Sequence, residues 1–178
     1  LGRGGHLGHI SLHADGEPDA FHIPGSLASF WGDQSLSHRS EGRYNRTVDL
    51  VAAVLSGDGD AQTLWDISIH RLAVAVASLI HVLDPERVIL GGGIAVGAGD
   101  ALRIPLQNYL DRYEWRPGGH KVQLRMASTG EWAGVLGSVC ALDRFPIMQP
   151  SACLGSTPLG ARNVEELHAE KAFTRKEP

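Results

Sequence analysis

The sequence has few of the features that mark disulfide-stabilised, membrane-spanning or nucleic-acid-binding proteins. Its 178 residues contain only two cysteines, Cys140 and Cys153. These define neither a disulfide framework nor a cysteine-based metal site, and they fit a reducing cytoplasm. The longest apolar-rich stretch, residues 72–83, is interrupted by Ser78 and His81 and is shorter than the ~20 residues that span a bilayer. The net charge of −4 argues against a dominant nucleic-acid surface.

Common nucleophile and phosphate-loop motifs are also missing from the sequence. Neither cysteine belongs to a Cys-x-x-Cys pair, and no Gly-x-Ser-x-Gly elbow occurs. The triplet Gly91–Gly93 is neither the spaced dinucleotide fingerprint nor a Walker loop, because no Lys-Ser/Thr follows it. The chain opens with Leu1 rather than Met and shows no basic segment before an apolar run. We therefore expect no signal peptide and interpret the chain as the middle of a longer protein.

The composition and the hydrophobic pattern predict one α/β domain followed by a tail. Apolar residues make up 43% and charged residues 20% of the chain, as in ordinary globular domains. We expect the domain to cover residues 1–145 and an extended or partly helical tail to cover 146–178, where Pro, Ser, Gly and mixed charge dominate. The pattern predicts strands at 9–13, 88–90 and 121–126, helices at 26–31, 47–54, 58–84, 99–113 and 132–144, and loops at 32–46 and 116–119.

Two of these elements carry the strongest signals. The helix that ends before Pro85 has a broad apolar face, which includes Ile67 and Leu83, and we expect it to pack on more than one side. The wholly apolar strand at 88–90 predicts burial on both faces. It runs into Gly91–Gly93, and glycines at the carboxyl end of such a strand let a ligand approach the backbone. A tight strand-to-helix turn without a ligand is the alternative.

Histidines are concentrated near the N-terminus. Imidazole binds metals and also forms hydrogen bonds with sugar hydroxyls. A zinc site needs about four converging ligands, which could come from these histidines and two carboxylates: His6, His9, His13, His22, Asp15 and Asp19. The spacing matches no strong zinc template, and surface histidines are the simpler interpretation of His13 and His22. We interpret Arg116 and Lys121 as solvated charges and Glu131 as part of a first helical turn.

Four stretches together resemble the second half of ROK-family proteins, which are sugar kinases and sugar-responsive repressors. The first resembles the family's Gly-Glu-x-Gly-His segment and the second its Cys-x-Cys-Gly-x-x-Gly-Cys-Leu-Glu segment. The third resembles its strand and adenosine-side loop, and the fourth its closing helix. In chain order the four stretches are Gly5–Ile10, Gly16–Leu27, Leu83–Ile94 and Ser128–Gly137.

The resemblance implies the C-terminal lobe of an actin-like (ribonuclease H-like) ATPase fold, with a mixed sheet and flanking helices. It implies transfer of the ATP γ-phosphoryl group to a hexose or related sugar, with Mg²⁺, by a cytoplasmic, glucokinase-like transferase. It assigns nucleotide binding to Gly91, Gly92 and Gly93, and sugar binding to His9 and His6. The family's catalytic Asp and phosphate loop lie in the N-terminal half, so no catalytic residue is assigned here. Expected partners are a sugar, a nucleotide, and an N-terminal lobe or a second copy, but no membrane and no nucleic acid.

The chain also departs from the family pattern. His6 stands where the family has a sugar-binding Glu, and Ala28 stands where it has a second one. The three zinc cysteines align with Asp19, Phe21 and Ser26, so we expect the zinc to be lost and Phe21 to act as an apolar plug. A rebuilt site from His9, Asp19 and His22 is the alternative.

Three hypotheses of function remain open at this point. The first is a ROK-type sugar kinase whose other lobe lies outside this sequence, so that the chain alone is inactive. The second is a ROK-like protein that binds a sugar or a partner without catalysis, which the replacements at His6 and Ala28 favour. The third is a histidine-based metal-binding module.

Overall fold

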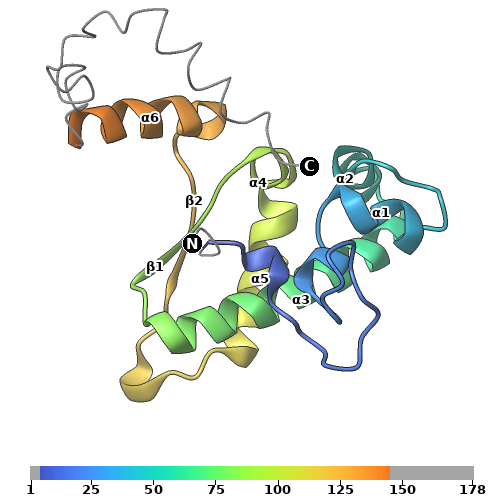
Figure 1. Ribbon diagram of the computed structural model, residues 1–178, viewed down its shortest axis with the longest axis horizontal. Coiled ribbons are helices and arrows are strands. Elements are labelled where there is room, and N and C mark those ends of the chain that lie inside the picture. The colour runs from blue at the N-terminus through green and yellow to red at the C-terminus, as the bar shows by residue number, and fades with distance from the viewer. Residues whose placement is uncertain (1–4, 145–178) are drawn as a thin grey trace, which may run out of the picture. The chain divides into compact units, whose positions relative to one another are not determined.

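The computed structural model describes residues 5–144, so the tail predicted at 146–178 lies outside the described residues. The chain divides after Gly134 into two compact units. The described elements of the first unit are α1 (Asp33–Arg39), α2 (Thr47–Leu55), α3 (Gly59–Leu83), β1 (Arg87–Leu90), α4 (Gly93–Ala98), α5 (Asp100–Tyr113) and β2 (Gln123–Met126), with single 3-10 turns at Leu7–His9, Leu27–Ser29, Pro117–Gly119 and Gly130–Trp132 (Figure 1). Helix α6 (Ala133–Arg144) begins in the last two residues of the first unit and continues into the second; it confirms the helix predicted at 132–144.

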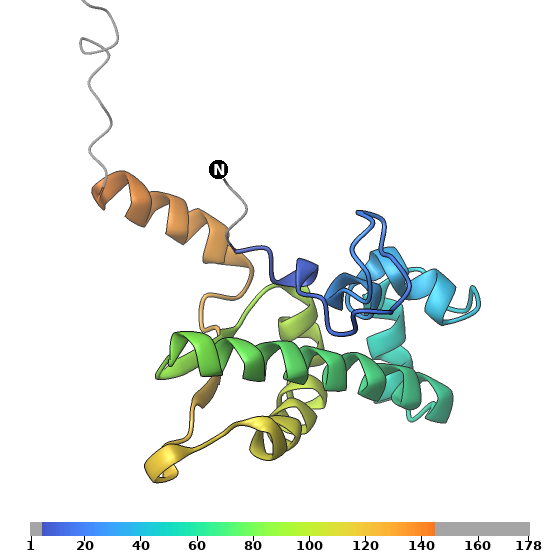
Figure 2. The ribbon, with the colours of Figure 1, turned by 60° about the horizontal axis from the view of Figure 1, so that its bottom comes forward.

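Helix α3 is the centre of the first unit, and α2 and α5 pack against it (Figure 2). It begins where the Asp58 carboxylate accepts a hydrogen bond from the Ala61 N–H at 2.8 Å, which satisfies a free donor of the first turn. It ends at Asp84, whose left-handed backbone (φ 46°) precedes Pro85. The indole N–H of Trp65 donates to the Ala101 carbonyl at 3.0 Å and so fixes α3 to α5.

The length and hydropathy of α3 would suffice to cross a membrane. Its Trp65, Ile69 and Ala73 side chains are buried among those of α2 and α5, which is the environment of a core helix. The predicted apolar face was too broad, however, because Ile67 and Leu83 are exposed.

The described sheet is smaller than the mixed sheet that we expected. Strands β1 and β2 form one parallel pair in which Arg87 lies opposite Gln123 and Leu90 opposite Met126. Val88 and Leu90 face the helical core, whereas Ile89 is 66% exposed. The prediction of a strand buried on both faces is therefore wrong for the first unit, because its helices cover only the face that carries Val88 and Leu90.

Two predictions for the first fifty residues are also wrong. The strand predicted at 9–13 is a 3-10 turn followed by a single bridge between Ser11 and Ser26. The exposed loop predicted at 32–46 contains α1, whose Leu36 is completely buried. The pattern missed α1 because its other side chains are polar and the helix has only seven residues.

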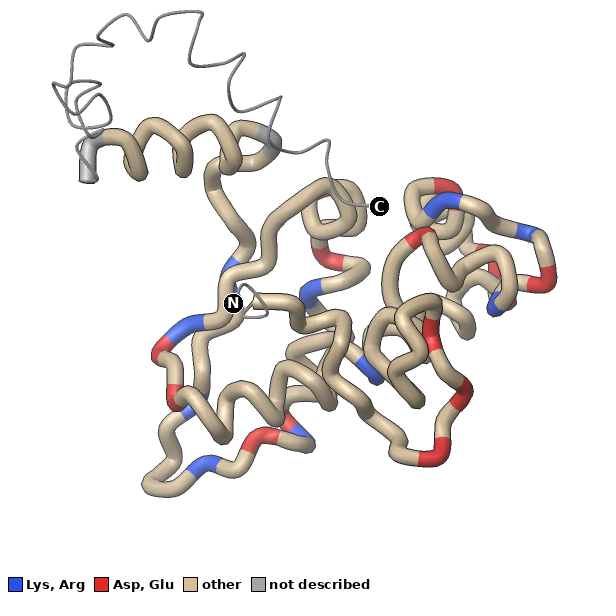
Figure 3. Tube along the Cα trace, viewed as in Figure 1, with Lys and Arg blue, Asp and Glu red and all other residues tan. Residues whose placement is uncertain are grey.

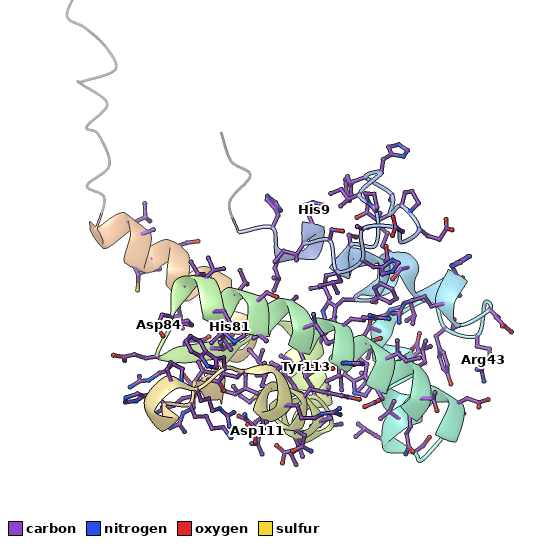
Figure 4. All side chains as sticks on the ribbon, turned by 90° about the horizontal axis from the view of Figure 1, so that it is seen from below. His9, Arg43, His81, Asp84, Asp111 and Tyr113 are labelled. Carbon is purple, nitrogen blue, oxygen red and sulfur yellow. The ribbon has the colours of Figure 1, made fainter. Side chains whose placement is uncertain are left out.

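The loop charges Arg116 and Lys121 are not simply solvated, contrary to our interpretation. Both donate to the Asp111 carboxylate, at 2.7 Å each, and Arg116 also pairs with Glu114. Figure 3 shows this cluster of blue and red segments along α5 and the chain that follows it, and Figure 4 labels Asp111. The hydrogen bond from Lys121, followed by that from Arg116, lowers the pKa of Asp111 to about 2. The cluster connects α5 to the segment that leads into β2.

Candidate functional site

The glycine triplet lies at the carboxyl end of β1, and each glycine has a different environment. A Cβ atom at Gly91 would lie 3.3 Å from the Cβ of Ala127, so Gly91 allows close packing against the end of β2. Gly92 has φ 89° and ψ 172°, a conformation that is essentially restricted to glycine. A Cβ atom at Gly93 would meet nothing within 4 Å. The backbone at Gly93 is therefore open to a ligand.

Two cavities flank this turn. The first, of 310 Å³, is lined by the three glycines together with Trp31 and Leu72. The second, of 640 Å³, lies between α2 and α4. Its lining residues are Asp33, Arg46, Thr47, Val48, Val51, Ala52, Leu55, Gly93, Ile94, Gly97 and Ala98. A mostly apolar cavity of roughly 300–1,000 Å³ with a few polar groups is typical of a small-molecule site.

The polar end of the second cavity is fixed by Asp33. Its carboxylate accepts hydrogen bonds from the Thr47 hydroxyl at 2.5 Å and from the Thr47 backbone N–H at 2.6 Å. These bonds, the one from the hydroxyl first, lower the pKa of Asp33, and they hold the start of α1 against the start of α2. Arg46, the N-cap of α2, lines the same cavity and supplies a cationic group there.

The sequence pattern did not predict α4, so it did not predict that residues after Gly93 line a cavity. The segment Gly93–Ala98 contains only small and β-branched residues and two glycines, which reads as loop rather than helix. A useful signal was its position directly after the glycine triplet of a parallel strand, where a helix commonly follows.

The proposed sugar histidines lie on the N-terminal loop. His6 and His9 flank the turn Leu7–His9, with ring centroids 5.7 Å apart, and Figure 4 labels His9. The rings of His9 and Phe21 are T-shaped, with centroids 4.9 Å apart, and the His9 Nδ1 atom is buried without a partner in the described residues. Phe21 is 60% exposed, so the prediction that it acts as an apolar plug is wrong. A Cβ atom at Gly8 would lie 3.8 Å from the Cβ of Ala28, so the turn Leu7–His9, which follows His6, packs against the turn that contains Ala28.

Asp19 organises the loop that follows. Its carboxylate accepts hydrogen bonds from the Phe21 N–H at 2.8 Å, the Ile23 N–H at 3.0 Å and the Ser26 hydroxyl at 2.5 Å. The bond from Ser26, then that from Ile23, lowers the pKa of Asp19. The carboxylate therefore joins the two ends of the segment 19–26 without a metal.

These residues do not fit a zinc ion. Phe21 cannot act as a ligand, and both oxygens of Asp19 already accept hydrogen bonds. His22 is exposed and has a left-handed backbone, φ 62°. In the described part of the chain no three His, Cys, Asp or Glu residues converge as a metal site would require. The described geometry therefore gives no support to a rebuilt site from His9, Asp19 and His22, or to the metal site that would add His13 and Asp15.

A sequence model of the ROK family matches residues 1–144. The chain belongs to the ROK family. Among its relatives is a glucokinase of Halalkalibacterium halodurans, 32% identical over 89 residues, which are 50% of this chain and 27% of that enzyme. The bifunctional enzyme NanE/NanK of Brucella melitensis is 27% identical over 140 residues, 76% of this chain and 24% of that protein. The matched part of this chain therefore spans about a quarter of the length of these two relatives.

Solved structures share the fold. The ROK hexokinase of Thermus thermophilus superposes with a TM-score of 0.67 at 29% identity, over 79% of this chain and 48% of that chain. The ROK-family glucokinase of Streptomyces griseus, solved with glucose and AMPPNP, gives a TM-score of 0.65 at 21% identity, over 78% and 51%. The second match shows the fold alone. ROK sugar kinases have an actin-like fold, and the described α/β unit with its parallel strands is similar to part of it.

Proposed function

We propose that residues 1–145 form the C-terminal lobe of an ATP-dependent ROK sugar kinase and supply part of its nucleotide site. In this proposal the catalytic Asp and the main phosphate loop come from residues outside the sequence, and the chain alone does not phosphorylate a sugar. The Mg²⁺ ion enters with the nucleotide. The protein acts in the cytoplasm, with an N-terminal lobe or a second copy as its partner.

The observation that carries this proposal is the apolar cavity between α2 and α4, which opens beside the glycine turn. Its walls of Val48, Val51 and Ile94 suit a flat heterocycle such as adenine. Gly91 and Gly92 form the turn, and the open backbone at Gly93 lets the rest of the nucleotide approach. Arg46, at the polar end of the cavity, supplies a positive charge for a phosphate.

The sugar side of the proposal rests on His9 and His6. Imidazoles can donate or accept single hydrogen bonds, whereas a carboxylate accepts bonds from two hydroxyls. Because Ala28 offers no hydrogen-bonding side chain, this lobe would hold the sugar by fewer contacts than a family member with both carboxylates. A weaker or different sugar specificity follows. The same replacements favour the second candidate, a ROK-like protein that binds a ligand without catalysis.

The test is AMPPNP binding measured by isothermal titration calorimetry with Mg²⁺ present. Gly97→Leu is the informative variant, because Gly97 lines the cavity and a Cβ atom there would meet no atom within 4 Å. The added side chain occupies space that the nucleotide needs and should weaken binding at least tenfold. Gly59→Leu is the matched control. A Cβ atom at Gly59 would also meet no atom within 4 Å, but Gly59 is the first residue of α3 and does not line the cavity.

Equal binding by the wild type and Gly97→Leu would contradict the proposed nucleotide site, as would no binding by the wild type. Phosphoryl transfer then separates the two candidate functions. The chain combined with the N-terminal half of its reading frame should phosphorylate a hexose if it is a kinase. Nucleotide binding without any transfer in that combined protein would favour the non-catalytic candidate.

A further inference from the structure

A third cavity, of 770 Å³, lies beside the loop that Asp19 organises, and two arginines line it. Arg39, from α1, and Arg71, from α3, both line it. Among the described residues neither arginine pairs with a carboxylate, although Arg43, Arg103 and Arg116 all do. Partly buried guanidinium groups are normally paired, because desolvation of an uncompensated charge is costly.

The contacts of Arg39 leave its charge uncompensated. Its Nη1 donates to the Ser68 hydroxyl at 2.8 Å, and its Nε donates to the Ser35 hydroxyl at 3.3 Å. Both acceptors are neutral. Burial lowers the pKa of the Arg39 guanidinium, which shows that its surroundings do not favour the charge. The two hydroxyls fix the position of the group and leave its remaining donors free.

Arg71 lies in the same wall of the cavity. It follows Ser68 by three residues on α3, so the two side chains share one helix face. The Cζ atom of Arg71 lies 4.9 Å from the centroid of the Phe30 ring, a contact that holds the guanidinium in place. Its Nε is buried and has no hydrogen-bond partner in the described residues. An unsatisfied buried donor of this kind costs stability unless a ligand accepts from it.

The acidic side chains of the cavity form no ion pair with these arginines among the described residues. The Asp19 carboxylate keeps its charge in the lining, but its oxygens accept hydrogen bonds from its own loop. Glu17 lines the cavity but is exposed, so water screens its charge. The other titratable groups in the lining are His13 and His38. The cavity therefore offers an anion two fixed guanidinium groups.

We propose that this cavity binds a phosphate group, free or as a phosphate monoester, between Arg39 and Arg71. Guanidinium donors match the oxygens of a phosphate in pairs, and two cations balance a phosphate dianion. This site is distinct from the nucleotide cavity between α2 and α4, although its lining includes Ala28, one of the two altered sugar positions.

The test is titration of the whole chain with inorganic phosphate and with glucose 6-phosphate at constant ionic strength. Binding is followed by calorimetry and by phosphorus NMR. Arg71→Gln should weaken binding at least tenfold, and Arg39→Gln should do the same. Arg103→Gln is the matched control and should leave binding unchanged, since Arg103 does not line this cavity and pairs with Asp100 at 2.8 Å. Circular dichroism checks that each variant is folded.

Arg71→Lys provides a second comparison if Arg39→Gln does not fold. It keeps the charge but loses the paired donors, so its affinity should lie between those of the wild type and Arg71→Gln. Glucose is titrated in the same way as the control for the sugar. Binding of inorganic phosphate alone would identify free phosphate as the ligand, and tighter binding of glucose 6-phosphate than of either inorganic phosphate or glucose would identify a monoester. No binding of either probe would overturn the proposal, as would equal binding by the wild type and Arg71→Gln. Gly97→Leu should leave phosphate binding intact, so failure of this site is distinguishable from failure of the nucleotide site.

Discussion

In the glycine turn after β1, alanine should have opposite effects on the free energy of unfolding at Gly92 and at Gly93. Gly92 has φ 89° and ψ 172°, whereas Gly93 has the backbone of the first residue of α4. A Cβ atom at either position would meet nothing within 4 Å. Because neither alanine would clash with a neighbour, the difference between Gly92→Ala and Gly93→Ala measures the backbone conformation alone.

The expected magnitudes follow from that conformation. Holding a non-glycine residue in the region that Gly92 occupies costs about 1–3 kcal/mol, so Gly92→Ala should lower the free energy of unfolding by that amount. Alanine in a helix is favoured over glycine by roughly 0.5–1 kcal/mol. Gly93→Ala should therefore leave the free energy of unfolding unchanged or raise it by up to about 1 kcal/mol.

Urea unfolding followed by tryptophan fluorescence is the assay, because Trp65 is buried between α3 and α5. Relative to the wild type, the urea concentration at the midpoint of unfolding should fall for Gly92→Ala and stay the same or rise for Gly93→Ala. The dependence of the unfolding free energy on urea concentration should be similar in both variants. Equal destabilisation by both substitutions would refute the reasoning. It would mean that packing or a bound group, and not the backbone conformation of Gly92, determines the glycine requirement of this turn.

Three further predictions concern the rest of the molecule. The pKa of Asp111 is depressed to about 2. The ionised carboxylate therefore stabilises the fold fully above its unfolded pKa of about 4, and this stabilisation is lost as the pH falls toward 2. In an acid titration followed by circular dichroism, Asp111→Asn should lose less stability than the wild type between about pH 4 and pH 2. Leu36→Ala should lower the free energy of unfolding by about 2–5 kcal/mol, since Leu36 is fully buried, and a change under 1 kcal/mol in urea unfolding would argue against α1 as a packed helix. Elemental analysis should find no stoichiometric zinc in the wild type, and one zinc per chain in a variant that restores cysteines beside His9; zinc in the wild type would contradict the metal-free loop. That variant is Asp19→Cys, Phe21→Cys and Ser26→Cys combined.

The sequence was most informative where local signals agreed. Helix α3 was predicted with both ends nearly correct, because Asp58 caps it and Pro85 follows its last turn. The strand and the glycine turn at 87–93 were also recognisable, since a short apolar run before three glycines has few other interpretations. The family was identified from the same segments and from three others.

Features that depend on distant contacts were not predictable in the same way. Helix α1 is held by the Asp33–Thr47 hydrogen bonds, which join residues fourteen positions apart. The cavity beside the glycine turn needs α2 and α4 together, and α4 carried no recognisable pattern. The alternation at 9–13 suggested a strand, but Ile10 and Leu12 are half-buried on a turn with one bridge. Alternation of apolar and polar residues over only five positions cannot distinguish a strand from a turn with a single bridge.

For the loop at 19–26, comparison with the family's sequence pattern did not predict which contacts hold the loop. Matching the zinc cysteines to Asp19, Phe21 and Ser26 indicated that zinc would be lost, but not what would hold the loop. The structure supplies the Asp19–Ser26 hydrogen bond and the contact between the His9 and Phe21 rings. These contacts depend on side-chain directions that the sequence does not determine.

Photoaffinity labelling with an azido-ATP analogue, followed by peptide mapping, tests the central claim most directly. The claim is that the cavity between α2 and α4, beside the glycine turn, holds the adenosine part of a nucleotide. We predict that the label is incorporated into peptides from residues 46–55 and 93–98, and that excess ATP prevents it. Labelling confined to other segments, or labelling that ATP does not reduce, would contradict the claim.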